Sequence, residues 1–309
     1  FLLTIDSRTR EDIMINDFTI GRSDFSVTVY VPWNCTNNCK FCSSKKDYER
    51  IKGDYEKVKQ SLQLIRDSML PIVVFTGGEP SADIDKLREL LRIVDNKVVY
   101  INTSLPKRNC KEFIELVNSN ECIRSISISR HTHSYEEDSK ILHQIAEDEV
   151  IATIKKPVRI NVVEQSKDSF SIESMEKYVS RWTRIAKMKG GAYSLILNLR
   201  SNYITQSKSD LHEMTDSKVV NDLATAYYYQ SHTFCNVCDT CTFIKFNKEH
   251  EDELIINYHR GVMTTAVQFA NVVEINDLII LQNGDICYDW DGKNENISKF
   301  LSMINTKKQ

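Results

Sequence analysis

The chain has 309 residues, of which 41% are hydrophobic and 27% are charged, and its formal net charge is −3. Such a small net charge gives no general attraction to nucleic acid or to membrane surfaces. No apolar run reaches the roughly 18 residues of a membrane-spanning helix, and no secretory signal is recognisable. Seven of the nine cysteines fall into spaced clusters. This indicates metal ligands in a reducing compartment, and we expect a cytoplasmic protein.

Short apolar runs rich in β-branched residues alternate with longer amphipathic stretches through the first two thirds of the chain. Six candidate strands cover residues 27–31, 72–75, 98–102, 125–129, 158–163 and 193–199. Candidate helices cover residues 54–68, 110–118, 135–146 and 171–188. A further helix is expected directly after Ser81, which would be its N-cap. A strand followed by a helix, repeated six times, predicts an α/β fold with a parallel sheet and right-handed crossovers. The polar residues 201–232 end this alternation and include one predicted helix, over 218–229.

Three cysteines follow the first predicted strand in a C-x3-C-x2-C run, at Cys35, Cys39 and Cys42. Thiolates are the usual ligands of iron–sulfur clusters, and a cubane cluster needs four ligands. A run that supplies three thiolates therefore leaves one iron open for a ligand that is not protein. Short cysteine runs also bind zinc, so the run by itself is compatible with either metal.

A second motif, Gly77-Gly78-Glu79-Pro80, follows the second predicted strand. Two glycines let the backbone approach a ligand without a clash at Cβ. A carboxylate suits an ammonium group, because a charged hydrogen bond between them is short and strong. The element is therefore a candidate site for a ligand that carries an amino group.

Together, about 35 residues apart and in this order, the two motifs resemble the signature of the radical S-adenosylmethionine (SAM) enzymes. The resemblance implies a partial (β/α)6 TIM-like barrel and a [4Fe–4S] cluster held by the three cysteines. It also implies that the Gly-Gly-Glu-Pro element binds the amino group of SAM and that Phe41 packs near the adenine. One electron from a flavodoxin or ferredoxin would then cleave SAM to a 5′-deoxyadenosyl radical, which abstracts a hydrogen atom from the substrate.

Small polar residues follow several of the predicted strands, and the active site of an α/β barrel lies at the C-terminal ends of its strands. The resemblance implies that the ends of the third and fourth strands hold the ribose and the carboxylate of SAM. The expected contacts are Thr103 or Ser104 near the ribose, Ser129 and Arg130 near the carboxylate, and Asn161 near the ribose or adenine. Arg130 and His131 are the candidate catalytic residues. The alternative is that all of these are ordinary loop residues and helix caps.

A second cluster of cysteines, Cys235, Cys238 and Cys241, forms a C-x2-C-x2-C run, and Cys287 follows 46 residues later. Asn283-Gly284 lies between alternating apolar residues, which predicts a β-hairpin that carries Cys287 back toward the other three. Four thiolates can hold a second [4Fe–4S] cluster or a structural zinc ion. We favour the cluster because the first motif already implies iron–sulfur assembly. No ligand role is expected for the two remaining cysteines, Cys110 and Cys122.

The cysteine-rich C-terminal segment resembles the twitch and SPASM extensions of radical SAM enzymes. We therefore expect an N-terminal extension over 1–24, a barrel core over 25–200 and a small cluster-binding extension with a β-hairpin over 201–309. Because the first residue is Phe1, we expect the native start to lie upstream. The resemblance also covers the GTP-cyclising enzyme of molybdenum-cofactor synthesis, but the arginines of that enzyme are replaced here by Asp239-Thr240-Cys241-Thr242.

Three functions remain open on the sequence alone. The first is a radical SAM enzyme that acts on a small molecule, such as a nucleotide, in a biosynthetic pathway. The second is a maturase that modifies a ribosomally made peptide. The third is a non-catalytic protein that binds an iron–sulfur cluster or zinc, which the intact motifs disfavour. A closed pocket would favour a small molecule and an open groove a peptide, while cationic residues in the cavity would favour a phosphorylated substrate.

Overall fold

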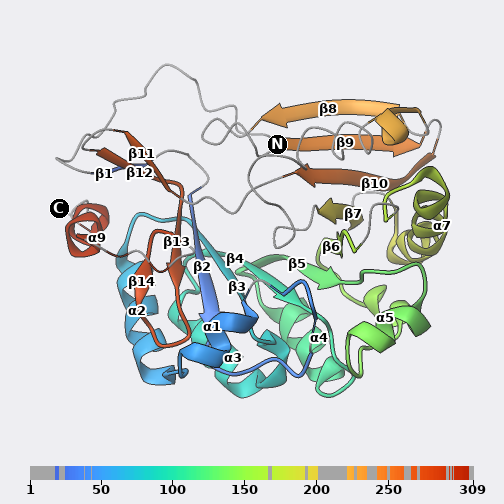
Figure 1. The fold of residues 1–309 in the computed structure, drawn as a ribbon. Helices are drawn as coiled ribbons and strands as arrows, with labels where there is room; N and C mark the ends of the chain where they lie inside the picture. The colour runs from blue at the N-terminus through green and yellow to red at the C-terminus, as the bar shows by residue number, and fades with distance from the viewer. Residues whose placement is uncertain are drawn as a thin grey trace.

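The computed structural model describes most of the barrel and parts of the segments around it. The described residues are 18–20, 25–37, 39–42, 44–165, 169–191, 194–200, 221–225, 228–234, 242–248, 251–260, 266–269, 272–289, 292, 294 and 296–305. A mixed sheet of eleven strands runs through the molecule, and helices cover its outer face (Figure 1).

Six strands at the centre of this sheet lie side by side in chain order, and each is parallel to the next. They are β2 (Ser26–Val31), β3 (Ile72–Gly77), β4 (Val98–Thr103), β5 (Ile123–Ser129), β6 (Val158–Val163) and β7 (Leu195–Arg200). All six were expected from the sequence. The order is linear and does not close on itself, so the predicted partial barrel is confirmed.

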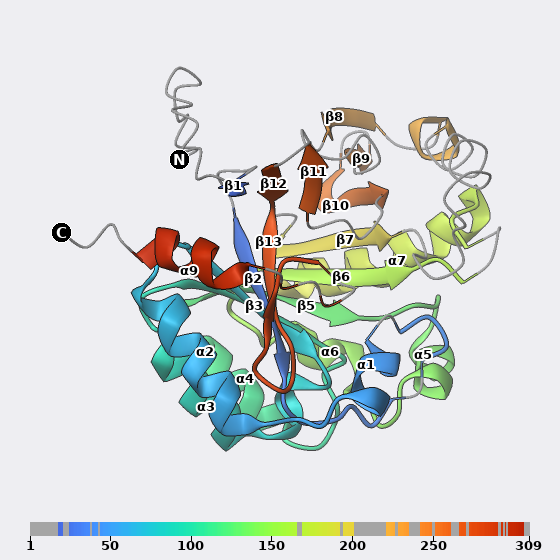
Figure 2. The same cartoon turned by 60° about the vertical axis from the view of Figure 1, so that its left-hand side comes forward.

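Helices follow these strands. They are α1 (Lys45–Arg50), α2 (Tyr55–Asp67), α3 (Ile84–Ile93), α4 (Cys110–Ser119), α5 (Tyr135–Ile141), α6 (Asp148–Ile151) and α7 (Ile172–Lys189). The longer ones, α2, α3, α4 and α7, each bury an apolar face. In α3, for example, Leu87, Leu90 and Leu91 are buried at helical spacing. Figures 1 and 2 show α2, α3 and α4 together on one side of the sheet, and α7 lies beside β7.

Two of the expected helix boundaries are wrong. Asp83, not Ser81, is the N-cap of α3, because its carboxylate accepts a hydrogen bond from the Lys86 amide at 3.1 Å. Ser81 lies one turn earlier, in the 3-10 turn η1 (Pro80–Ala82). The helix expected over 135–146 ends at Ile141, since the backbone turns extended at the next residue and Gln144 adopts a left-handed conformation.

Strands from the last third of the chain extend the sheet at both edges. At one edge β13 (Asp277–Ile280) is parallel to β2, and β14 (Ile286–Cys287) pairs with β13 in the predicted hairpin. At the other edge β10 (Glu251–Arg260) is parallel to β7, followed by β9 (Thr242–Lys248) and β8 (Tyr228–Phe234). The predicted helix over 218–229 is therefore wrong at its last two residues, because Tyr228 and Tyr229 belong to β8. Helical backbone is confined to 221–225 among the described residues of that stretch.

A smaller sheet pairs the first described strand with two strands from the last third of the chain. Its strands are β1 (Phe18–Ile20), β12 (Val272–Ile275) and β11 (Ala266–Phe269). The last helix, α9 (Ile297–Asn305), lies beside α2 (Figure 2), and its Phe300 ring packs against Phe18 and Phe25. Residues 1–17 and 21–24 of the expected N-terminal extension lie outside the described residues.

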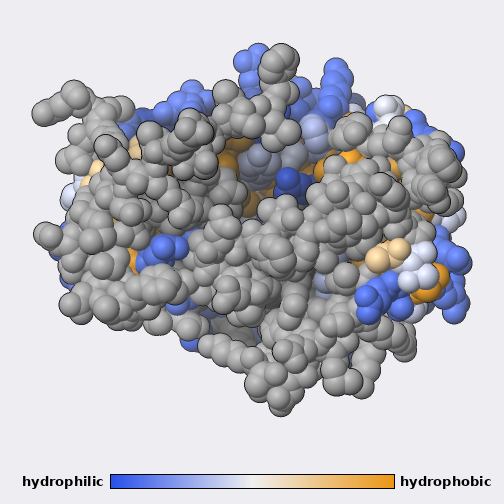
Figure 3. Space-filling view, turned by 90° about the horizontal axis from the view of Figure 1, so that it is seen from above, coloured by the Kyte–Doolittle hydropathy of each residue, from blue (hydrophilic) through white to orange (hydrophobic). Residues whose placement is uncertain are grey.

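Few large hydrophobic side chains are exposed on the described surface, namely Leu64, Met69, Val98, Ile172 and Met188. Seen from above, hydrophilic and hydrophobic described residues lie next to one another on the same face (Figure 3). Isolated apolar side chains of this kind are normal on protein surfaces. None of the described helices has the length and apolar character that crossing a membrane requires.

Candidate functional site

A cavity of about 390 Å³ lies at the C-terminal ends of the parallel strands. The ends of β3, β4, β5, β6 and β7 line it on one side, and the cysteine loop with the start of α1 lines it on the other. This volume is within the range of about 300–1,000 Å³ that small-molecule sites occupy. The position is the one at which α/β barrels carry their active sites.

The three cysteines of the first motif all line this cavity and are half-buried. The loop is tightened by a hydrogen bond from the Cys42 amide to the Cys39 carbonyl at 3.2 Å. Burial raises the pKa of Cys35 to about 11, and burial together with the Cys42 thiol raises the pKa of Cys39 to about 12. A bound cationic centre would reverse this effect, because metal coordination deprotonates thiols.

Among the described residues, no three His, Cys, Asp or Glu side chains converge on a single point as ligands of one metal ion must. A cubane cluster has a different requirement, since its thiolates bind separate irons. Three thiols around one cavity therefore suit a cluster with an open iron. Cys35, Cys39 and Cys42 are the residues that would hold it.

Glu79 is the buried anion of the cavity, with 2% of its surface exposed. One carboxylate oxygen accepts hydrogen bonds from the Ser81 hydroxyl at 2.8 Å and from the Thr103 hydroxyl. The other accepts from the amide and the hydroxyl of Ser104, at 2.7 and 2.6 Å. Neutral donors thus hold the negative charge in place, and an ammonium group in the cavity would find a fixed counter-ion. Thr103 and Ser104, expected at the ribose, both line the cavity and both orient Glu79.

Arg130, expected to bind the carboxylate of SAM and to act in catalysis, does not line the cavity. Its side chain is fully buried, and its guanidinium donates to the carbonyls of Ser104, Ser129 and Ala146 at 2.7–2.8 Å. The physical reason is strand alternation, since the preceding residue, Ser129, faces the cavity and Arg130 points the other way. The geometry therefore gives Arg130 a supporting role behind the cavity wall.

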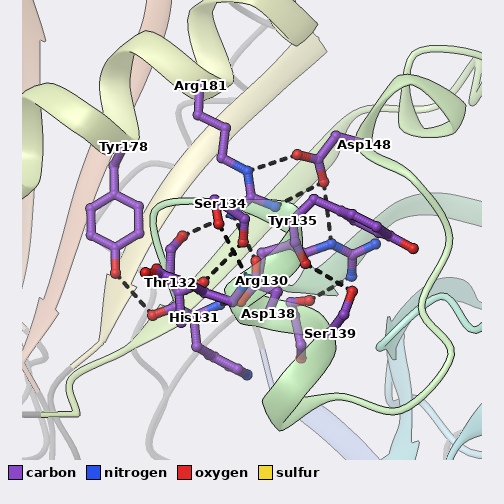
Figure 4. Close-up of polar contacts among 12 residues, drawn as sticks. Arg130, His131, Thr132, Ser134, Tyr135, Asp138, Ser139, Asp148, Tyr178 and Arg181 are labelled. Atoms are coloured by element: carbon purple, nitrogen blue, oxygen red, sulfur yellow. Dashed lines mark hydrogen bonds and ion pairs between the residues drawn. The ribbon is translucent and has the colours of Figure 1, made fainter.

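A buried ion network includes Arg130 (Figure 4), and its four charged residues do not line the cavity. Arg181 on α7 reaches Asp148 and Asp138, each at 2.7 Å. Asp138 in turn accepts hydrogen bonds from the amides of His131 and Thr132, at 2.6 and 3.0 Å. The network fixes the segment that follows β5. A surface hollow of about 520 Å³ lies next to this network. The arginines that line the hollow are paired with carboxylates that also line it, as Arg184 is with Glu149.

His131, the second candidate catalytic residue, lines the cavity but is held as a neutral ring. Burial and the adjacent Arg130 charge lower the pKa of His131 to about 3. Its Nδ1 accepts a hydrogen bond from the Val163 amide at 3.2 Å, so Nε2 carries the proton. The ring meets the Phe41 ring edge-on, with centroids 4.6 Å apart. His131 can therefore donate one hydrogen bond and orient Phe41, and its lowered pKa keeps the ring neutral near pH 7.

The remaining predicted ligands of SAM are also gathered at the cavity. Ser129 and Asn161 line it, and the Asn161 side chain accepts a hydrogen bond from Asn198 at 2.7 Å. Gly77, Gly78 and Phe41 line it as well, whereas Pro80 is buried outside it. Sequence reasoning missed Trp33 and Tyr48, which contact the Gly-Gly-Glu-Pro element. No sequence signal links these aromatic residues to a motif that lies more than 25 residues further along the chain.

The second predicted metal site cannot be assembled from the described residues, because Cys235, Cys238 and Cys241 lie outside them. Cys287 is on β14 with 1% of its surface exposed, in a cluster with Tyr30, Ile279 and Leu281. The four-cysteine site therefore stays a prediction. Cys110 and Cys122 pack on the main hydrophobic core.

Comparisons with known proteins agree with this geometry. Residues 31–169 match the model of the Radical SAM superfamily. No curated protein matches the sequence. Among solved structures, SuiB of Streptococcus suis bound to S-adenosylmethionine has a TM-score of 0.54 at 16% identity, over 85% of this chain and 59% of SuiB. SuiB bound to precursor peptide SuiA has a TM-score of 0.52 at 16% identity, over 85% of this chain and 58% of that one.

The partial barrel and the cysteine-lined cavity at its strand ends define a radical SAM domain. This domain is similar to the radical SAM superfamily over residues 31–169. This match supports a [4Fe–4S] cluster and SAM as its cofactors. At these identities the likeness to SuiB concerns the fold, and the chain spans less than two thirds of SuiB.

Proposed function

We propose that this chain is a radical SAM enzyme that modifies a peptide. The observation that carries the enzymatic part is one cavity lined by three thiols and a buried carboxylate. When bound at the thiols, a cluster with an open iron would supply the electron that cleaves SAM to methionine and a 5′-deoxyadenosyl radical. Glu79 would bind the ammonium group of SAM, and Phe41, oriented by His131, would pack on its adenine. The residues around the cavity then position the target C–H bond and exclude water, which is the main contribution a protein makes to such chemistry.

A peptide substrate is favoured by the fold, which is shared with SuiB in its complex with precursor peptide SuiA. An anionic small molecule such as a nucleotide is the second candidate. The observation that favours it is the presence of Lys45 and Arg200 among the cavity-lining residues, since cations recognise phosphate. In either case we propose a flavodoxin or ferredoxin as the electron donor. We also propose a reducing compartment such as the cytoplasm, because the thiolate ligands of an iron–sulfur cluster persist where thiols are kept reduced.

Anaerobic reconstitution with iron, sulfide and SAM tests the enzymatic part. The wild-type protein is expected to release 5′-deoxyadenosine, and a variant with Cys35, Cys39 and Cys42 all changed to Ala is expected to release none. The matched control changes Cys110 and Cys122 to Ala and keeps the activity, because both lie away from the cavity. Equal release from all three proteins would contradict the proposal.

Two further measurements sharpen the assignment. An iron content near eight per chain in the wild type, falling to about four in the triple variant, supports a second [4Fe–4S] cluster. About four irons per chain together with bound zinc in the wild type would instead indicate that the second site holds zinc. To identify the substrate, short peptides encoded next to the gene of this protein are synthesised. They are compared with nucleotides for their ability to increase the rate of SAM cleavage. A mass change in a peptide supports the maturase, and turnover of a nucleotide alone would overturn it.

A further inference from the structure

The phenol of Tyr48 bridges the segment that leads into the cysteine loop and the Gly-Gly-Glu-Pro element. In the proposed function the cysteine loop holds the cluster and the Gly-Gly-Glu-Pro element binds SAM. Tyr48 lies on α1, directly after the cysteine loop. Its hydroxyl donates to the carbonyl of Val31 at 2.6 Å and accepts from the amide of Gly78 at 2.7 Å. Val31 is the last residue of β2, and Gly78 directly follows β3. The phenol therefore joins the point where the chain enters the cysteine loop to the backbone of the Gly-Gly-Glu-Pro element.

Both glycines of that element lie close against the segment that carries the cysteines. A Cβ on Gly77 would lie 2.3 Å from the Tyr48 hydroxyl oxygen, and Gly77 also adopts a φ of +94°. A Cβ on Gly78 would lie 2.0 Å from the carbonyl oxygen of Trp33. The indole N–H of Trp33 in turn donates to the Glu79 carbonyl at 2.7 Å. Close approach to the cysteine-bearing segment, and not only to a ligand, accounts for the two glycines.

Tyr48 itself is held rigidly. Its ring stacks on Tyr30 with centroids 6.0 Å apart and an interplanar angle of 18°. Tyr30 is buried with Ile279 and Leu281 from the β13 edge of the sheet. Burial raises the pKa of Tyr48, so the phenol keeps the proton that it donates to Val31. A stiff, protonated phenol between two main-chain groups fixes their separation better than a solvated loop contact does.

We propose that Tyr48 is a positioning residue that holds the Gly77–Glu79 backbone in register with the cysteine loop. In this role it aligns the thiols with the carboxylate that would bind the ammonium group of SAM. Trp33 supports the same alignment through the Glu79 carbonyl. The role presupposes the proposed SAM-cleaving function, and it concerns binding geometry and not the chemical step.

The test uses the reconstituted full chain with Tyr48→Phe, which keeps the ring and removes both hydrogen bonds. The matched control is Tyr55→Phe, because the Tyr55 phenol bonds Glu89 on α3, away from the cavity. Iron content and the melting temperature are measured first, followed by SAM affinity in equilibrium dialysis and the EPR spectrum of the reduced cluster with and without SAM. We expect Tyr48→Phe to bind SAM about tenfold more weakly and to give an altered SAM-induced EPR change, at wild-type iron content.

A double-variant cycle identifies the contact directly. Gly77→Ala is expected to weaken SAM binding less in the Tyr48→Phe background than in the wild type, because the hydroxyl that the new Cβ would overlap is gone. Wild-type affinity and EPR behaviour in Tyr48→Phe, or additive effects in the cycle, would overturn the positioning role. If the wild-type protein neither binds SAM nor shows an EPR change, the proposed function fails instead, so the two failures are distinguishable.

Discussion

Two charged regions at the strand ends are built in opposite ways. At the end of β3 and β4, the buried Glu79 faces the cavity, and the described residues that bond to its carboxylate are hydroxyl and amide donors, with no cation among them. Behind the end of β5, four charged residues pair with one another and none of them lines the cavity. Paired charges satisfy each other and stabilise the wall, whereas the unpaired anion is available to a cationic ligand. The comparison separates a residue that binds from residues that support.

The largest expected effect comes from breaking the supporting network with Arg130→Met. This change removes three hydrogen bonds to main-chain carbonyls and leaves Asp148 without one of its two cationic partners. We expect the free energy of unfolding to fall by about 4 kcal/mol, measured by anaerobic denaturation. The control is Arg88→Met, because Arg88 is only partly buried and its partners Asp85 and Glu112 are at the surface. Unchanged stability combined with lost SAM binding would place Arg130 in the binding site and undo the comparison.

The next effect in size comes from Glu79→Gln, which keeps the shape and removes the charge. All the described partners of the carboxylate are donors, so the amide nitrogen would face a donor and the ligand would lose its counter-ion. We expect SAM affinity to fall about a hundredfold, or about 3 kcal/mol, in equilibrium dialysis. Glu112→Gln, on the exposed face of α4, should change nothing. SAM affinity at the wild-type level in Glu79→Gln would show that another group receives the ammonium.

Near neutral pH a smaller effect concerns His131, and it grows as the pH falls. Its pKa is about 3 in the folded protein and about 6.5 in the unfolded chain. As pH falls below about 6.5, the unfolded chain takes up a proton that the folded protein does not, so stability decreases by up to about 1.4 kcal/mol per pH unit. This contribution is fully present above pH 6.5. His131→Asn should show a shallower loss of stability between pH 6.5 and 4, and parallel curves would contradict the neutral buried ring.

The smallest effect is expected at an exposed ion pair. Lys177 and Glu173 on α7 lie 2.8 Å apart, and both side chains are more than half exposed. Water and salt screen such a pair, so Lys177→Ala should leave the melting temperature and SAM affinity unchanged within error. A clear loss of stability would mean that exposed ion pairs stabilise the fold as much as buried ones do.

The sequence predicts what depends on local pattern. The six strands follow from apolar runs, and the cysteine loop and Glu79 follow from motifs whose members lie within a few residues of one another. The boundary of α3 was missed because Ser81 and Asp83 are both good caps, and the hydroxyl of Ser81 bonds to Glu79 instead. Arg130 was assigned to the cavity because it follows a strand, although alternation from Ser129 already indicates the opposite face.

Contacts between distant segments could not be predicted in this way. The Tyr48 phenol meets an amide 30 residues later, and no periodicity encodes that meeting. The pairing of β10 with β7 and of β13 with β2 joins strands separated by long stretches of chain. A strand at a sheet edge carries the same apolar pattern whichever neighbour it joins, so tertiary packing alone decides the partner.

The pairing of β13 with β2 has a consequence for synthesis on the ribosome. Ser26 in β2 bonds to Asp277 in β13, 251 residues later. At about 5–20 residues per second, translation takes roughly 12–50 seconds to cover that interval. Throughout this time the first strand of the nascent barrel has an open side, which is the kind of edge that pairs with foreign chains. The emerging polypeptide therefore exposes this strand edge for longer than a barrel whose first strand is paired on both sides early in synthesis.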